Sequence, residues 1–133
     1  MRWMGPEMLW PEEFGLKESR PSKQSDCYSL AMTIYEVCDR VIMAKLRFLM
    51  RCNQVLYGEM PYWGFSENVA MVKILSGVRP KRPPSAAMFG FTDGLWKILE
   101  RCWSEDRDAR PDVQAILSQL NYAARAWGRG RPV

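Results

Sequence analysis

The chain has 133 residues, of which 47% are hydrophobic and 26% charged, and its net charge is +4. A chain of this length buries roughly two-thirds of its unfolded surface, so the composition predicts one folded domain rather than a disordered segment. The sequence contains no histidine, which excludes an imidazole base, a Ser/His/Asp or Cys/His nucleophile system and any histidine-ligated metal site.

The four cysteines show neither a CxxC pair nor the spacing of a zinc ribbon, so we expect no metal site. Each lies among apolar residues, which is typical of reduced cysteines that pack as small hydrophobic side chains. The sequence has no signal-peptide pattern and no uncharged apolar run long enough to span a bilayer. We therefore expect an intracellular, cytoplasmic protein without a membrane partner. The cysteines are Cys27, Cys38, Cys52 and Cys102.

Prolines interrupt the first 24 residues at positions 6, 11 and 21, which predicts a loop with one short helical turn. From Ser25 the sequence becomes almost wholly apolar through Cys38, as in a helix that is buried on all sides. Ser25 or Asp26 is the expected N-cap. Helical character continues from Val41 to Met50, and the turn residues 57–61 end it.

Ser66 is expected to cap a second helix, which carries an apolar stripe and stops at Gly77. A basic, proline-rich connector, residues 79–84, follows. A third helix begins at Thr92 or Asp93 and has one wide apolar face that reaches Trp103.

Pro111 suits the first turn of a fourth helix. Its apolar residues recur at helical spacing, and we expect a disordered tail at residues 128–133. No segment shows the alternation of a half-buried strand. The predicted fold class is therefore mainly α, with four or five helices. The stripe of the fourth helix consists of Val113, Ile116, Leu117 and Leu120, extended by Ala124 and Trp127.

Four groups of residues, in this order, resemble landmarks of the carboxy-terminal lobe of a eukaryotic protein kinase, especially of the tyrosine-kinase and tyrosine-kinase-like branch. Residues 2–7, Arg-Trp-Met-Gly-Pro-Glu, resemble the end of the activation segment, with Gly5 in place of the family's alanine. Residues 25–30 resemble the start of the central helix of that lobe, and residues 58–63 resemble the loop after it. Cys102 and Trp103, followed by Asp106 and Arg110-Pro111, resemble the junction of the last two helices.

The resemblance implies the helical lobe of the protein-kinase-like fold without the β-rich amino-terminal lobe. Residues 1–127 would form a partial kinase domain. Glu7 and Arg110 would form a buried ion pair, in which the arginine fork holds the carboxylate. Asp26 would cap the central helix and, as in kinases, anchor the catalytic loop. Trp103 and Pro111 are expected to be structural residues, and Arg2 and Trp3 are the positions expected to face a protein substrate.

The segment from about Cys38 to Val55 has no counterpart in the family pattern, and two interpretations stay open. It is either an insertion without function, such as translated non-coding sequence, or a cover for the central helix. In the second case its apolar residues would fold back over a side of that helix that the rest of a kinase domain normally covers. These residues are Ile42, Leu46 and Leu49.

Phosphoryl transfer requires a glycine-rich phosphate cover, a lysine on the nucleotide, magnesium ligands and an aspartate that orients the hydroxyl. The 133 residues hold none of these motifs, and the absence of histidine removes His-Arg-Asp. We therefore expect no catalytic, cofactor-binding or metal-binding residue in this chain, although the complete family domain uses ATP and magnesium. The main hypothesis is an inactive kinase fragment.

The alternative is a non-catalytic, pseudokinase-like module that binds proteins through residues 66–77 and the basic connector. A nucleic-acid contact by the Arg-Gly tail with Trp127 is the weakest hypothesis, because a frayed, solvated end explains this tail better.

Overall fold

The computed structural model describes residues 1–50, 61–82 and 91–129; for residues 39–50 and 127–129 it describes the backbone only. Two short helices come first, α1 (Pro6–Leu9) and the 3-10 helix η1 (Pro11–Phe14), and the long helix α2 (Lys23–Met50) follows. The described residues after α2 form helices joined by turns and loops. These helices are α3 (Glu67–Leu75), α4 (Asp93–Cys102), the 3-10 helix η3 (Arg107–Ala109) and α5 (Val113–Arg129).

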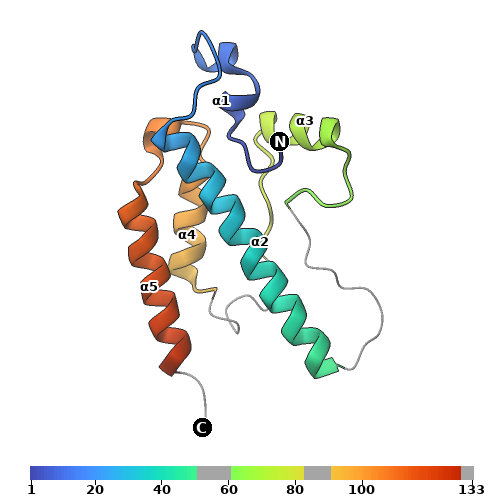
Figure 1. Cartoon of the computed structure of the whole chain (residues 1–133), viewed down its shortest axis with the longest axis vertical. Helices are drawn as coiled ribbons and strands as arrows, with labels where there is room; N and C mark the ends of the chain where they lie inside the picture. Colours follow the sequence, from blue (N-terminus) through green and yellow to red (C-terminus); the bar gives the residue numbers. More distant parts are fainter. Residues whose placement is uncertain (51–60, 83–90, 130–133) are drawn as a thin grey trace.

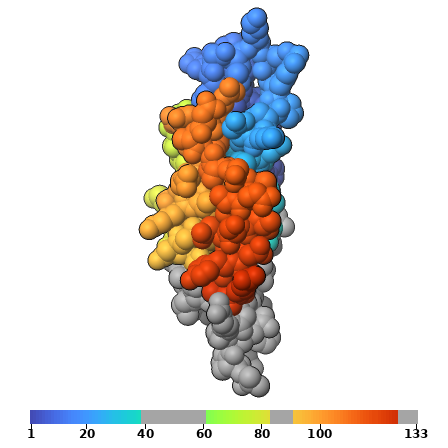
Figure 2. All heavy atoms as spheres, turned by 90° about the vertical axis from the view of Figure 1, so that its left-hand side faces the viewer, coloured from blue at the N-terminus to red at the C-terminus, as the bar shows by residue number. Residues whose placement is uncertain are grey.

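Helix α2 lies across the molecule, with α4 packed between it and α5 (Figure 1). The space-filling view shows α4 and α5 side by side on one face, with the N-terminal segment above them (Figure 2). The described residues contain no strand, so the prediction of a mainly α fold is confirmed. The core forms where these helices meet. Its largest wholly buried hydrophobic side chains are Tyr28, Met32, Ile74, Phe91, Leu99, Trp103 and Ile116.

The start of α2 differs from the predicted position. The backbone N–H of Ser25 donates to Oγ of Ser22 at 3.1 Å, and the N–H of Ser22 donates to Oγ of Ser25 at 2.8 Å. This reciprocal pair makes Ser22 the N-cap and places Ser25 and Asp26 inside the helix. The prediction of Ser25 or Asp26 as the cap was wrong, because it depended on where the apolar run begins.

The predicted cap of α3 and the predicted start of α4 are confirmed. Ser66 Oγ accepts the N–H of Val69 at 3.4 Å, and Thr92 Oγ1 accepts the N–H of Leu95 at 3.2 Å. Gly77 follows α3 with a φ of 73°, a left-handed conformation that suits glycine after a helix.

Pro111 lies before α5 rather than in its first turn. Asp112 Oδ1 accepts the N–H of Ala115 at 2.8 Å, so Asp112 is the N-cap. Helix α5 ends at Arg129 and thus includes the first two residues of the predicted tail, while residues 130–133 lie outside the described part.

Helix α2 continues without a break from Lys23 to Met50 (Figure 1). Ile42, Leu46 and Leu49 therefore extend the same helix, which rises about 1.5 Å per residue, and do not fold back over its first half. The hypothesis that these three residues fold back over the central helix was therefore wrong. Residues 51–60, which include the rest of the unusual segment, lie outside the described residues. Among the helices described, none is both long and apolar enough to span a membrane.

Candidate functional site

Glu7 and Arg110 form a two-pronged ion pair deep in the molecule. Arg110 Nη1 donates to Glu7 Oε1 at 2.6 Å, and Nη2 donates to Oε2 at 2.9 Å. Their side chains are only 2% and 0% exposed, respectively. Helix α1 and the loop before α5 hold the two residues in place, and the pair predicted from the sequence is present. Because both charges are buried, each depends on the other for compensation.

Arg110 also joins two further segments to this pair. Its Nε donates to the carbonyl of Ser104 at 3.0 Å, and Nη1 donates to the carbonyl of Gln24 at 3.1 Å. Burial alone would raise the pKa of Glu7, but the hydrogen bond and charge of Arg110 hold it below its ordinary value. The carboxylate is thus charged at neutral pH, and one arginine connects α1, the start of α2 and the loop after α4.

Tyr28 lies in the second turn of α2, and two arginines face its ring. The guanidinium carbons of Arg110 and Arg79 lie 5.2 Å and 5.6 Å from the ring centroid, within cation–π range. Burial raises the pKa of the Tyr28 hydroxyl far above its ordinary value, with a further contribution from Tyr62. Tyr28 therefore stays neutral and acts as packing beneath the ion pair. Neither Tyr28 nor Arg79 was singled out from the sequence as a site residue.

Arg2 is turned into the protein rather than toward a substrate. Its guanidinium donates to the carbonyls of Pro61, Tyr62 and Phe65 at 3.3, 2.5 and 2.5 Å and pairs with Glu67 at 3.0 Å. The residue is 8% exposed. The expected substrate-facing role does not fit this position, because the donors are occupied within the chain. Arg2 instead fixes the N-terminal segment to the turn before α3.

Trp3 is partly buried, and its Nε1 donates to Glu36 Oε2 on α2 at 3.0 Å. Its predicted contact with a protein substrate stays a prediction. Trp103, in contrast, is 2% exposed, and its indole nitrogen makes no hydrogen bond within the described part of the chain. Its ring meets Tyr35 and Trp96 edge-on, with centroids 6.0 and 5.6 Å away. Trp103 is therefore a packing residue.

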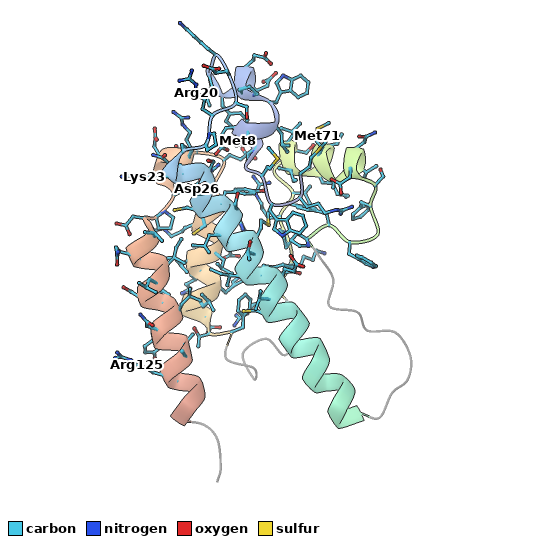
Figure 3. All side chains as sticks on the ribbon, in the orientation of Figure 1. Met8, Arg20, Lys23, Asp26, Met71 and Arg125 are labelled. Carbon is cyan, nitrogen blue, oxygen red and sulfur yellow. The ribbon has the colours of Figure 1, made fainter. Side chains whose placement is uncertain are left out.

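Asp26 lies exposed near the start of α2, as the stick view shows (Figure 3). Together with Arg110 and Pro111 it lines a mainly apolar groove of about 590 Å³ between the beginnings of α2 and α5, to which Cys27, Leu30 and Val113 also contribute. The structure thus brings three of the predicted residues to the lining of one groove.

The described residues bring together no group of three or more histidine, cysteine, aspartate or glutamate side chains that could hold a metal ion. The geometry is that of an internal scaffold, in which buried ion pairs and carbonyl contacts fix the N-terminal segment against α2, α3 and the loop before α5. The structural role of Arg2 was missed because its carbonyl partners lie about 60 positions away in the sequence, and such partners leave no motif. Arg79, which was not singled out, donates to the carbonyls of Ile74, Val78 and Trp103.

The chain is similar to known proteins over most of its length. Residues 1–120 match the family model described as protein tyrosine and serine/threonine kinase. The chain is 28% identical over 129 residues to serine/threonine-protein kinase STY17 of Arabidopsis thaliana, covering 96% of this chain and 17% of that protein.

Ephrin type-A receptor 6 of Mus musculus is 26% identical over 125 residues, which cover 94% of this chain and 9% of the receptor. The putative neurotrophin receptor LTRK 1 of Lymnaea stagnalis is 25% identical over 122 residues, which cover 90% of this chain and 12% of the receptor. The chain thus spans less than a fifth of the length of each of these three relatives.

Proposed function

Because the chain belongs to the protein tyrosine and serine/threonine kinase family, we propose that its residues form the helical scaffold of a kinase domain and do not transfer phosphate by themselves. The observation that carries the proposal is the buried pair of Glu7 and Arg110. It fixes the Gly-Pro-Glu segment, which resembles the end of an activation segment, to the helices that support it.

The chemistry of the family supports the proposal that this chain is scaffold and that other parts of a kinase domain carry out catalysis. Phosphoryl transfer depends on positioned phosphates, magnesium ions and an aspartate near the attacking hydroxyl. The 133 residues contain none of the motifs that supply these groups. ATP and magnesium would therefore be bound by other parts of a complete domain, and an intracellular location fits the buried free cysteines Cys27 and Cys102.

The first experiment tests for catalysis by the chain. The purified 133-residue protein is incubated with labelled ATP, magnesium and mixed serine, threonine and tyrosine peptides, with an active protein kinase as the positive control. We expect no phosphate transfer above a control without enzyme and no rise of the melting temperature with ATP. Transfer that increases with the concentration of the chain would contradict the proposal.

A chimera tests the scaffold role directly. Residues 1–120 replace the matching part of the Arabidopsis thaliana kinase, with residues 38–55 deleted in a parallel version. We expect measurable kinase activity in at least one chimera and its loss on Arg110→Gln, because the ion pair that holds the scaffold is broken. Two folded chimeras without activity would show that this scaffold does not support catalysis.

A second candidate function is a protein-binding module without catalysis, and the surface around α3 favours it. Several large apolar side chains are exposed there, on α3 or in the loops beside it, next to the basic connector. They are Trp63, Phe65, Val69, Val72 and Val78. A photo-crosslinking residue at position 72 should join the chain to one discrete protein in cells, whereas the same residue at position 100, an exposed site on α4, should not.

A further inference from the structure

A small pocket at the start of α2 collects positive charge from two distant parts of the chain. Its volume is about 270 Å³, and its lining includes Lys17, Arg20 and Ser22 from the loop before α2 and Arg107 from η3. Figure 3 shows Arg20 in that loop and Lys23 on the first turn of the helix. The fold thus brings Arg107 to a site that is otherwise lined by residues 16–18 and 20–22.

The residues that line this pocket do not balance one another in charge. Glu18 is the acidic residue in the lining, so the lining has a net charge of +2. Glu18 pairs with Arg20 at 2.6 Å, but both side chains are largely exposed, at 60% and 78%. No described residue forms an ion pair with Lys17 or Arg107. Asp106 and Asp108, on either side of Arg107, do not line the pocket.

The fold itself does not account for this gathering of charge. Three cations in one pocket repel one another, and cations near the start of a helix oppose its dipole, which favours negative charge there. A bound anion would relieve both unfavourable interactions. The carboxylate of Glu7, on which the charge of Arg107 acts, does not supply this anion, because both terminal nitrogens of Arg110 already hold it.

We propose that this pocket binds a phosphate monoester, the group that a phosphorylated side chain carries. Such a group has a charge of about −1.5 to −2 at neutral pH, which matches the lining, and three acceptor oxygens suited to arginine and lysine donors. The pocket is smaller than the roughly 300–1,000 Å³ typical of sites for drug-sized ligands, so it fits a phosphate group rather than a whole nucleotide. Neither Glu7 nor Arg110 lines the pocket.

The test measures binding of two probes to the full 133-residue chain by calorimetry at low salt. The probes are inorganic phosphate and a short peptide with one phosphoserine, and the same peptide without phosphate is the control ligand. The double variant Lys17→Gln/Arg107→Gln should weaken binding of either phosphate probe by about tenfold or more, because charge-assisted hydrogen bonds are lost. Circular dichroism checks that this variant keeps its helices.

The matched control is Lys97→Gln/Arg101→Gln, which removes the same charge from α4, where both cations line another cavity together with Glu100. It should leave phosphate binding unchanged. Equal weakening by both double variants would overturn the proposal, because it would show general attraction to a basic protein. No binding of either probe by the unmodified chain would overturn it as well. Tighter binding of the phosphopeptide than of inorganic phosphate would identify a phosphorylated protein segment as the ligand source.

Discussion

Glu7 and Arg110, 103 positions apart in the sequence, meet in a buried ion pair whose two hydrogen bonds are 2.6 and 2.9 Å long. A pair of this kind is strongly coupled, since removal of either partner leaves a charge without compensation in the interior. The first two predictions follow from this contact.

The variant Glu7→Gln should lower the free energy of unfolding by about 3–5 kcal/mol, which is a large part of a typical stability of about 5–15 kcal/mol. Urea denaturation followed by circular dichroism measures this difference. The matched control is Glu18→Gln, because Glu18 also pairs with an arginine but on the surface. Exposed pairs contribute about 0–1 kcal/mol, so equal losses in both variants would contradict the assigned role of the buried pair.

The ion pair of Glu7 and Arg110 also makes the free energy of unfolding depend on pH. Because the pKa of Glu7 in the folded chain lies below its ordinary value of 4.5, the unfolded state takes up a proton first as the pH falls. The stabilisation is therefore complete above about pH 4.5 and is lost as the pH falls through the lowered pKa. Melting temperatures between pH 3 and 6 should fall more steeply for the unmodified chain than for Glu7→Gln. Parallel curves would show that another carboxyl group dominates.

Gly5→Ala should destabilise the chain even though the kinase motif normally has alanine at this position. A Cβ at Gly5 would lie 2.7 and 2.8 Å from the two carboxylate oxygens of Glu7, which are fixed by Arg110. We expect a loss of about 1–3 kcal/mol, as in other overpacked sites, measured by urea denaturation. Gly15→Ala does not test the same effect, because Gly15 has a φ of 68°. The double variant Gly5→Ala/Glu7→Gln should instead lose less than the sum of the two single variants, since the carboxylate is then no longer fixed.

Arg2→Met should loosen the turn before α3 without unfolding the helical core. Four hydrogen bonds from Arg2 hold residues 61–67, so their removal should speed amide exchange in that segment by roughly tenfold or more. Hydrogen–deuterium exchange with mass spectrometry measures the effect peptide by peptide. Arg20→Met, which removes an exposed arginine, serves as the control. Uniform acceleration over α4 and α5 would mean that Arg2 supports the whole fold.

The fold class, the cap of α3, the start of α4 and the pair of Glu7 and Arg110 could be predicted because each depends on a local pattern or a familiar motif. Ser66 and Thr92 stand directly before apolar helical stripes. The start of α2 was missed because it depends on two reciprocal hydrogen bonds between Ser22 and Ser25. These bonds begin the helix three positions before the apolar run from which its start was predicted. The burial of Arg2 depends on carbonyl groups some 60 positions away, and no sequence pattern predicts such contacts.

Four aromatic rings that join α2 to α4 have a spectroscopic consequence. Tyr35, Trp103, Trp96 and Phe91 touch in succession, each edge-on to the next, with centroids 5.6 to 6.0 Å apart. Trp103 is wholly enclosed by this packing, whereas Trp10 and Trp63 are about half exposed. Loss of the contact between α2 and α4 should therefore shift the fluorescence of Trp103 to longer wavelength and abolish the near-ultraviolet dichroism of its close neighbour Trp96. The protein thus carries an intrinsic optical probe of its own core.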